Sequence, residues 1–387
     1  MKVLAIETSC DETGICILEH TLDTIHIRGN ALASQIDIHA QYGGVFPALA
    51  KRAHAEKLVS LLTEALTQAG LLTAGSVSTD LSWMDDKDAT LRDALTDFFA
   101  SYAKPDIDYI AVTVGPGLEP ALWVGVNAAR ALASVWNIPV IPINHMEGHV
   151  VTAAIEKTAE DTYKFGDLQF PVLSLLVSGG HTELVIAEAF GNYKKIGATR
   201  DDAVGEAFDK VARVLGLPYP GGPAVSALAA KWRSSFDFAQ DENKFSLPRP
   251  MLHSGDYDFS FSGIKTAVLY AAKEIGELTD DQKMALAAEF ETAAIEVLVK
   301  KTLKAAEEFQ TPTIIVGGGV AGNTYLRSEL SNAFATKFSQ TKVLFPEPWL
   351  ATDNAVMIGL AALTQISGAN IKTRNPDELR ANGNLSL

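Results

Sequence analysis

Two histidines in this 387-residue sequence have the spacing of a metal site. On a helix, His145 and His149 would lie on one face, close enough to bind a single ion, although such a pair also occurs as partly exposed surface residues. Glu147 lies between them in the wrong position for the His-Glu-x-x-His order, which excludes a zincin protease. Asp353, just before an apolar helical run, is the leading candidate for a third ligand. Two imidazoles and one carboxylate suit iron(II) or zinc, and the ligand types leave that choice open.

Two glycine-rich turns offer backbone N–H groups to an anion. Residues 178–182 are Ser-Gly-Gly-His-Thr, and residues 317–323 are Gly-Gly-Gly-Val-Ala-Gly-Asn. Neither matches the P-loop or the Rossmann fingerprint, and each alone is most often a plain tight turn. Together they favour binding of a phosphate and a nucleoside. Asp209, near the start of a predicted helix, could accept a hydrogen bond from a ribose, although a solvated helix acid is the ordinary role.

A third polar turn, Ser-Cys-Asp-Glu-Thr at residues 9–13, carries the carboxylates of Asp11 and Glu12. Next to a bound phosphate these charges would be unfavourable, so their position indicates either a metal ion or a proton relay.

The elements that carry these residues occur twice along the chain. Each half has two apolar, β-rich runs around a polar Ser-x-x-x-Thr turn, and later a β-rich run that ends in glycines and leads into a helix. The first set spans residues 2–18 and 108–117, and the second spans 171–187 and 311–319. This repetition predicts an internal duplication, with two similar α/β domains whose turns converge on a central cleft. A pair of unrelated βα units is the alternative.

Composition narrows the class of protein. Lys and Arg number 32 against 47 Asp and Glu, which gives a net charge of −15, and 47% of the residues are hydrophobic. This is a globular composition in a chain that is long for a single core. A strand-like beginning and the lack of a long apolar run predict a cytoplasmic protein without a membrane segment. Two cysteines, Cys10 and Cys16, fit a reducing compartment.

Residues 72–104 are predicted to be a surface insertion in the first domain. The stretch is acidic and rich in Ser, Thr and Asp, and it separates a predicted helix over 48–69 from the next strand. A solvated excursion is the simplest interpretation. Trp83, Phe98 and Phe99 support the alternative of a docking element.

Taken together, nine motifs resemble the bacterial TsaD family, the tRNA threonylcarbamoyladenosine synthase subunit once described as a glycoprotease. The resemblance runs from residue 1 to about residue 366. In chain order the motifs are IETSCDET, GPGL, NHMEGH, LLVSGGHT, DDAVGEAFDK, YPGGP, FSFSGIKTA, GGGVAGN and FPEPWLATDNAVMIG.

This resemblance implies the duplicated α/β fold of the actin-like, sugar-kinase-like ATPases. We place the boundary between its two domains after residue 150, which gives domains of residues 1–150 and 151–387. It also implies an activity, the transfer of a threonylcarbamoyl group from threonylcarbamoyl-AMP to tRNA. The acceptor would be N6 of the adenosine just 3′ of the anticodon, in tRNAs that read codons beginning with A.

The resemblance assigns roles residue by residue. His145, His149 and Asp353 would hold one divalent metal per subunit, iron(II) in preference to zinc, and Asp11 is a catalytic candidate. The residues on the nucleotide side are Leu176, Val177, Ser178, Gly179, Gly180, Asp209, Gly222 and Asn323. The chain departs from the family pattern at Ser226, where some members have an acid that would hold a hydroxyl group.

Partners follow from the same resemblance, because the family works on tRNA together with TsaB and the ATPase TsaE. The acidic composition requires that cations for tRNA be local or come from a partner. Local candidates on the predicted 48–69 helix are Lys51, Arg52, His54 and Lys57. Two alternatives remain: an ATP-dependent kinase or hydrolase of the same fold, and a non-catalytic scaffold like TsaB, which lacks the metal histidines.

Overall fold

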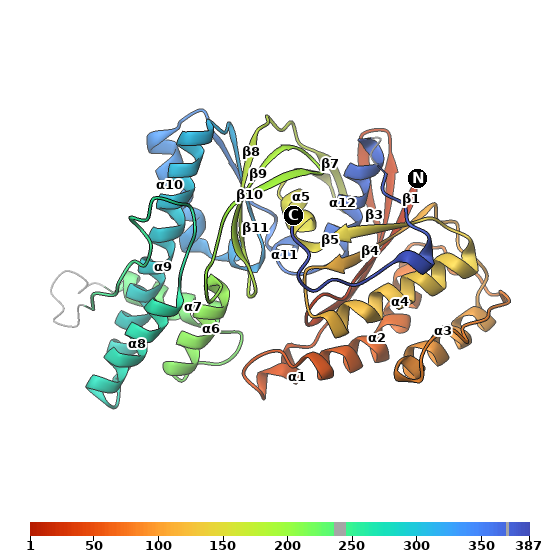
Figure 1. Cartoon of the computed structure of the whole chain (residues 1–387), viewed down its shortest axis with the longest axis horizontal. Helices are drawn as coiled ribbons and strands as arrows, with labels where there is room; N and C mark the ends of the chain where they lie inside the picture. Colours follow the sequence, from red (N-terminus) through yellow and green to blue (C-terminus); the bar gives the residue numbers. More distant parts are fainter. Residues whose placement is uncertain (236–244, 369–370) are drawn as a thin grey trace. The chain divides into compact units, whose positions relative to one another are not determined.

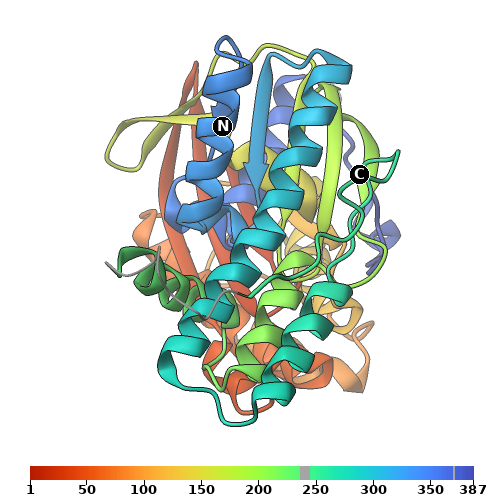
Figure 2. The same ribbon diagram turned by 90° about the vertical axis from the view of Figure 1, so that its left-hand side faces the viewer.

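The computed structural model describes residues 1–235, 245–368 and 371–387. The chain divides into two compact units (Figures 1 and 2). Unit 1 comprises Met1–Asp167 and Thr352–Leu387, and unit 2 comprises Leu168–Ala351. Within the described residues, no helix combines the length and the apolar character needed to span a membrane.

A seven-stranded sheet forms the centre of unit 1, in the order β5-β4-β1-β2-β3-β7-β6. β1 and β2 form the predicted antiparallel hairpin, while β1 pairs parallel with β4 and β4 pairs parallel with β5. The strands are β1 (Lys2–Glu7), β2 (Glu12–Thr21), β3 (Thr24–Ser34), β4 (Tyr109–Gly115), β5 (Val140–Asn144), β6 (Ile155–Ala159) and β7 (Thr162–Phe165).

Helices cover both faces of this sheet, because alternate side chains of a strand point to opposite faces. Ile15 and Ile17 of β2 pack in one core with residues of α2 and α4, whereas Leu18 lies against Gly359 of α12. The helices of unit 1 are α1 (Ile36–Ala40), α2 (Pro47–Gln68), α3 (Ala89–Ser101), α4 (Glu119–Trp136), α5 (His145–Thr152) and α12 (Ala355–Ser367), with 3₁₀ turns η1 (Asp86–Asp88) and η3 (Pro376–Glu378).

Unit 2 is built on a five-stranded sheet in the order β10-β9-β8-β11-β12. The long helix α9, seen in Figure 2, packs against α7, α8 and α10. The strands are β8 (Val172–Val177), β9 (Thr182–Ala189), β10 (Asn192–Ala198), β11 (Thr313–Gly317) and β12 (Lys342–Leu344). The helices are α6 (Val204–Val214), α7 (Gly221–Ser234), α8 (Ser262–Ile275), α9 (Asp280–Phe309), α10 (Thr324–Lys337) and α11 (Pro348–Ala351), with the 3₁₀ turn η2 (Gly319–Gly322).

The two sheets have the same topology. The order β5-β4-β1-β2-β3 in unit 1 corresponds to β12-β11-β8-β9-β10 in unit 2. The pairing directions also correspond, since β1 and β8 each have an antiparallel hairpin partner on one side and a parallel strand on the other. The internal duplication predicted from the repeated turns is therefore confirmed, and β6 and β7 are additions to unit 1.

The compact units differ from the predicted domains 1–150 and 151–387 in two stretches. Residues 151–167 belong to unit 1 because β7 pairs with β3 and β6 pairs with β7. Residues 352–387 also belong to unit 1, because α12 packs on β1, β2 and α5. Pairing and packing between distant parts of the chain thus decide both boundaries.

The stretch 72–104 is folded onto unit 1. Its helix α3 buries Leu95 and Phe98 together with Phe99, whose ring lies edge-on to Trp136 of α4 at 6.0 Å between centroids. Trp83, by contrast, is 40% exposed, and the Arg130 guanidinium lies 4.3 Å from its ring centroid. The simplest interpretation, a solvated excursion, is therefore wrong for the apolar side chains of α3, which complete the core, while most of the other residues in the stretch are exposed.

Candidate functional site

The two histidines lie one turn apart on α5, and Asp353 directly precedes the N-cap of the neighbouring helix α12 in unit 1. α5 begins at His145 directly after β5, and the side chain of Asn144 accepts a hydrogen bond from Met146 N at 2.9 Å, which caps the helix. Asp353 immediately precedes Asn354, whose side chain caps α12 by accepting from Met357 N at 3.0 Å. The two caps fix the backbone next to His145 and next to Asp353.

Glycines allow these helices to approach the sheet and each other. A Cβ on Gly148 of α5 would lie 3.0 Å from the Cγ of Met357 in α12. A Cβ on Gly14 of β2 would lie 2.9 Å from Ala355 N, at the start of α12. Side chains at either position would separate the elements that bring Asp353 to the histidines.

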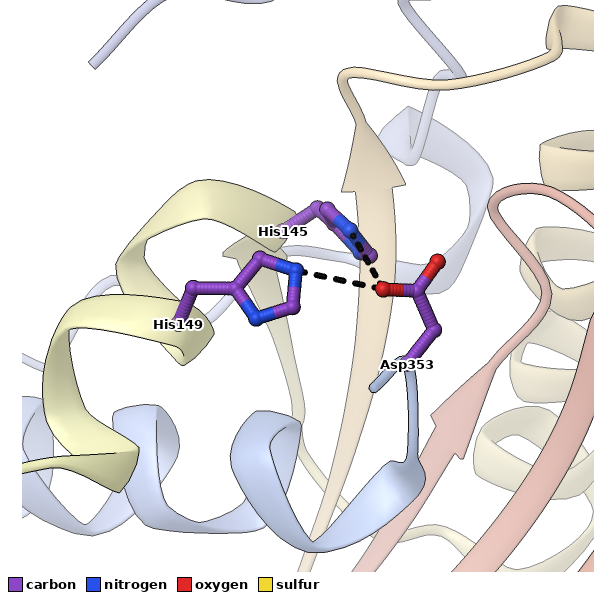
Figure 3. A group of neighbouring side chains, drawn as sticks. All are labelled: His145, His149 and Asp353. Atoms are coloured by element: carbon purple, nitrogen blue, oxygen red, sulfur yellow. Dashed lines mark ion pairs between the residues drawn. The ribbon is translucent and has the colours of Figure 1, made fainter. Parts of the chain in front are cut away.

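Figure 3 shows the three side chains pointing toward one another. Asp353 Oδ1 lies 3.4 Å from His145 Nε2 and 3.1 Å from His149 Nε2. One ligand atom from each residue lies within 4.8 Å of the other two, and both histidines are buried. All three residues belong to unit 1, although Asp353 lies in the second of the two predicted domains.

Glu7, at the end of β1, fixes the ring of His145 and was not predicted from the sequence. Its Oε2 lies 3.1 Å from His145 Nδ1 and also accepts from the Thr113 hydroxyl at 2.5 Å. Its Oε1 accepts from Ser9 N at 2.5 Å. A carboxylate on Nδ1 leaves Nε2 of the same ring as the metal-binding atom. The sequence contains one signal for this role, since Glu7 is an acid directly after the apolar run Val3–Ile6.

The charges of this group suit a cation. Burial alone would raise the pKa of Asp353, but the neighbouring imidazoles hold the pKa of this carboxyl well below its usual range. The pKa of Glu7 is likewise lowered, because the charge and hydrogen bond of His145 outweigh burial. The same two carboxylates outweigh burial at His145 and raise its pKa well above the ordinary value. Two buried carboxylates facing a pair of imidazoles carry two negative charges, which a divalent ion would balance.

His149 gives an independent test of the fit to a metal. The residue is fully buried, and its Nε2, which faces the Asp353 carboxylate at 3.1 Å, has no hydrogen-bond partner among the described residues. A buried imidazole with an unused nitrogen is unfavourable unless something coordinates it. The donor set of two imidazole nitrogens and one carboxylate fits iron(II) or zinc.

The turn that carries Asp11 lies beside this group. Ser9 Oγ is 3.1 Å from His145 Nδ1, and Asp11 is 9% exposed. Burial, followed by the charges of Asp353 and Asp11, raises the pKa of Glu12 to about 10. Burial and the neighbouring carboxylates of this turn therefore favour the neutral form of the Glu12 side chain.

Unit 2 carries the glycine turns. Leu176 and Val177 are buried in β8, and Ser178, Gly179 and Gly180 form the turn to β9. A Cβ on Gly179 or Gly180 would meet nothing within 4 Å, and the same holds for Gly222, Gly319 and Gly322. These positions leave open space over bare backbone, as a phosphate or nucleoside would require.

Gly318 has a different role from the one its sequence position indicates. Its φ is +92°, and a Cβ would lie 2.4 Å from the Val177 carbonyl oxygen. The lack of a side chain therefore allows the turn after β11 to pack on β8. The open positions next to it, Gly319 and Gly322, are the ones available to a ligand.

Asp209 and Gly222 are brought together at the start of α7. Asp209 Oδ1 accepts a hydrogen bond from Gly221 N at 2.7 Å, which ties α6 to α7. Gly205, near the start of α6, donates from its N–H to the Ser178 carbonyl at 3.2 Å. The turn between β8 and β9 thus meets α6, and α6 meets the start of α7.

Asn323 is held by its neighbours. Its Nδ2 donates to Ser226 Oγ at 2.9 Å and to Glu291 Oε1 at 2.7 Å, and its Oδ1 accepts from Leu326 N at 2.8 Å. Glu291 is fully buried and ion-paired with Arg233 at 2.6 Å. Asn323 therefore positions the start of α10, and sequence reasoning did not find the Glu291–Arg233 pair that orients it.

Comparison with known proteins decides the family. A model of the family "TsaD: tRNA N6-adenosine threonylcarbamoyltransferase" matches residues 26–74 and 90–360. The chain belongs to the TsaD family. It is 41% identical over 370 residues to a tRNA N6-adenosine threonylcarbamoyltransferase of Syntrophotalea carbinolica, covering 95% of this chain and 92% of that one. It is 42% identical over 372 residues to the protein of the same name from Ralstonia pickettii, with the same coverage of both chains.

A solved structure shows the same fold as this TsaD-family chain. Full-length HypF in its phosphate- and nucleotide-bound form matches with a TM-score of 0.52 at 12% identity, covering 96% of this chain and 56% of that one. At this identity the similarity concerns the fold alone. The fold class predicted from the sequence, a duplicated actin-like and sugar-kinase-like α/β fold, is confirmed.

The comparisons also bear on the other predictions. They support the TsaD family and its transferase class, and nothing in them favours the kinase or scaffold alternatives. The family model leaves residues 75–89 unmatched, and these lie inside the predicted insertion 72–104.

The helix proposed to contact tRNA offers fewer cations than expected. His54 of α2 is fully buried, with Nδ1 2.7 Å from Thr13 Oγ1 and Nε2 3.0 Å from the Cys10 carbonyl, so its prediction as an RNA contact is wrong. Lys51 Nζ is ion-paired with Asp88 at 2.8 Å. Arg52 and Lys57 lie on the exposed face of α2, where Arg52 is ion-paired with Glu56 at 2.8 Å.

Proposed function

We propose that this chain transfers a threonylcarbamoyl group from threonylcarbamoyl-AMP to N6 of the adenosine 3′ of the anticodon, in tRNAs that read codons beginning with A. The observation that supports it most is the convergence of His145, His149 and Asp353 within 4.8 Å in a chain of the TsaD family. A scaffold would not need this group, and a kinase would not require two imidazoles.

The proposed reaction balances as an acyl transfer. The N6 lone pair attacks the carbamoyl carbon, the bond from that carbon to the phosphate oxygen breaks, and AMP leaves with the bonding electrons. N6 is a poor nucleophile because its lone pair is delocalised into the purine, so positioning of both substrates is a large part of catalysis. The proton released from N6 needs an acceptor, and the carboxylate of Asp11 is our candidate.

The chain's own residues divide the work in this proposal. His145, His149 and Asp353 hold one divalent metal, iron(II) in preference to zinc, and Glu7 orients the ring of His145. When bound, the metal would supply Lewis acidity toward the carbamoyl or phosphate oxygens. In unit 2, the backbone of Ser178, Gly179 and Gly180 binds the phosphate of the nucleotide, with Leu176 and Val177 forming the strand behind it. Asp209 and Gly222 lie on the ribose side of the nucleotide. Asn323 contributes to that side by positioning the start of α10.

The test measures metal content and formation of N6-threonylcarbamoyladenosine together. In His145→Ala, His149→Ala and Asp353→Ala we expect metal occupancy to fall and product formation to drop by about 10³-fold or more. The control is His253→Ala, because His253 is exposed and lies in unit 2. Full activity in metal-free protein, or in all three ligand variants, would refute the proposed role of the group.

Partners and compartment are also proposals. The net charge of −15 leaves few cations for tRNA, so we propose that TsaB and TsaE assemble with this chain in the cytoplasm. Product formation should then require both proteins. Equal rates without them would remove this part of the proposal and leave the transferase assignment standing.

A further inference from the structure

An exposed aromatic pair lies on unit 1 and has no role in the site described above. Tyr42 and Phe46 are 54% and 50% exposed, and their ring centroids are 5.0 Å apart at a tilt of 56°. Among the described residues, four of the eleven exposed large apolar side chains fall between residues 32 and 46, the other two being Leu32 and Ile38. Clustered exposed apolar groups usually mark an interaction surface.

The backbone behind this pair is held in place. His39 is fully buried, its Nε2 lies 3.1 Å from Gln35 Oε1, and its Nδ1 accepts from Phe46 N at 3.4 Å. Tyr42 N donates to the His39 carbonyl at 2.9 Å, and the chain then reverses at Gly43, whose φ is +67°. Two rings on an ordered loop lose little further freedom when a ligand stacks on them.

Hydrogen bonds join this loop to the turn beside His145, His149 and Asp353, which we call the metal group. Gln35 N donates to the Asp11 carbonyl at 2.9 Å, and Ser34 of β3 is the register partner of Glu12 in β2. The same turn contacts His145 through Ser9 Oγ. An adenosine whose N6 reacts at this group therefore has neighbouring nucleotides close to the start of the loop.

The charge around the pair is compatible with RNA. Residues 38–55 contain no carboxylate, in a chain with 47 acids, and their two cations, Lys51 and Arg52, are ion-paired with Asp88 and Glu56 outside this stretch. The other exposed aromatic side chain of this unit, Trp83, lies within residues 80–97, which contain six carboxylates. Unpaired bases stack on aromatic side chains, whereas clustered carboxylates repel the phosphates between them.

We infer that Tyr42 and Phe46 form a stacking surface for the unpaired anticodon-loop bases that flank the target adenosine. This inference rests on the proposed function. The two residues bind and position the RNA. They do not contact the reacting atoms, which meet the residues of the metal group.

The test compares tRNA binding and turnover in single variants of the full chain. In Tyr42→Ala and Phe46→Ala, affinity for an anticodon stem-loop RNA should fall roughly 5- to 100-fold per ring, with a matching rise in the KM for tRNA. The kcat at saturating tRNA and the KM for threonylcarbamoyl-AMP should stay near wild type. Tyr42→Phe should restore binding and Tyr42→Leu should not, because stacking needs the ring. Trp83→Ala is the matched control and should change neither the affinity for the stem-loop RNA nor the KM for tRNA.

Abasic substitutions in the RNA locate the stacked base. Removal of the base that stacks on a given ring should lower the affinity of the RNA for the wild-type protein. It should not lower the affinity for the variant that lacks that ring. A blunt duplex of the same stem should show no difference among the variants. Unchanged stem-loop affinity and KM in both alanine variants would overturn the inference, whatever their effect on protein partners. Absence of product with the wild type would count against the proposed function instead, since stem-loop binding is measured separately.

Discussion

The two units share one sheet order and differ in what their hairpin turns carry. In unit 1 the turn between β1 and β2 holds Asp11 and Glu12, beside the histidines. In unit 2 the corresponding turn holds Gly179 and Gly180, where a Cβ would meet nothing. Carboxylates collect negative charge that a metal can balance, whereas bare backbone leaves room and N–H donors for an anion. One sheet position therefore supports two kinds of chemistry, and the turn residues decide which.

A second difference lies in the helices. In unit 1, α5 follows β5 and supplies both histidines. The chain that leaves β12 of unit 2 continues through α11 to α12, which packs on β1 and β2. Asp353, at the start of this last segment, thereby joins the histidines although more than 200 residues separate them. The duplication provides the frame, and the exchange of one helix completes the metal group.

The largest expected effect concerns two neighbouring glycines of unit 2. We expect Gly318 to be required for the fold and Gly319 to be required for binding of the ligand. Gly318→Val should lower the free energy of unfolding by about 3 kcal/mol or more, because the backbone has φ +92° and the Cβ meets the Val177 carbonyl. Gly319→Ala should leave stability near wild type and weaken AMP binding, since its Cβ would enter open space. Urea unfolding and calorimetric titration with AMP separate the two outcomes. Equal stability in both variants would contradict this assignment.

The next effect concerns the metal group of unit 1, for which unit 2 has no counterpart in our assignment. Glu7→Gln keeps the size of the side chain but removes the charge that faces His145 Nδ1, so metal affinity should fall roughly 10- to 100-fold. Competition with a chelator of known affinity measures this. The control is Glu147→Gln, a buried acid on α5 whose carboxylate accepts from Gln365 Nε2 at 3.3 Å. A similar loss in the control would mean that general destabilisation, and not ring orientation, explains the result.

Local patterns were enough to predict much of the fold and part of the site. The hairpins, the glycine turns and the spacing of His145 and His149 are properties of short segments, and the structure confirms their placement on β1–β2, β8–β9 and α5. Glu7 was not predicted, because its partner His145 lies 138 residues away and only packing brings them together. Asn323 is predicted as a ligand contact, and the sequence does not show that its amide also donates to Ser226 and Glu291.

The smallest expected effect concerns the insertion that unit 1 carries between α2 and β4. Lys51 Nζ pairs with Asp88 Oδ1 at 2.8 Å, and Asn127 Nδ2 donates to Asp88 Oδ2 at 2.9 Å. Both charged side chains remain partly exposed, at 29% and 15%, so Lys51→Met should lower the free energy of unfolding by only about 0.5–1 kcal/mol.

A double-mutant cycle of Lys51→Met with Asp88→Asn isolates the contribution of this pair, and urea unfolding measures it. The KM for tRNA should stay within a factor of about two of wild type, because the ammonium group is engaged with the insertion and not directed at RNA phosphates. A larger rise in this KM with unchanged stability would instead make Lys51 an RNA contact. The insertion would then influence the substrate surface of unit 1 by competing for that cation.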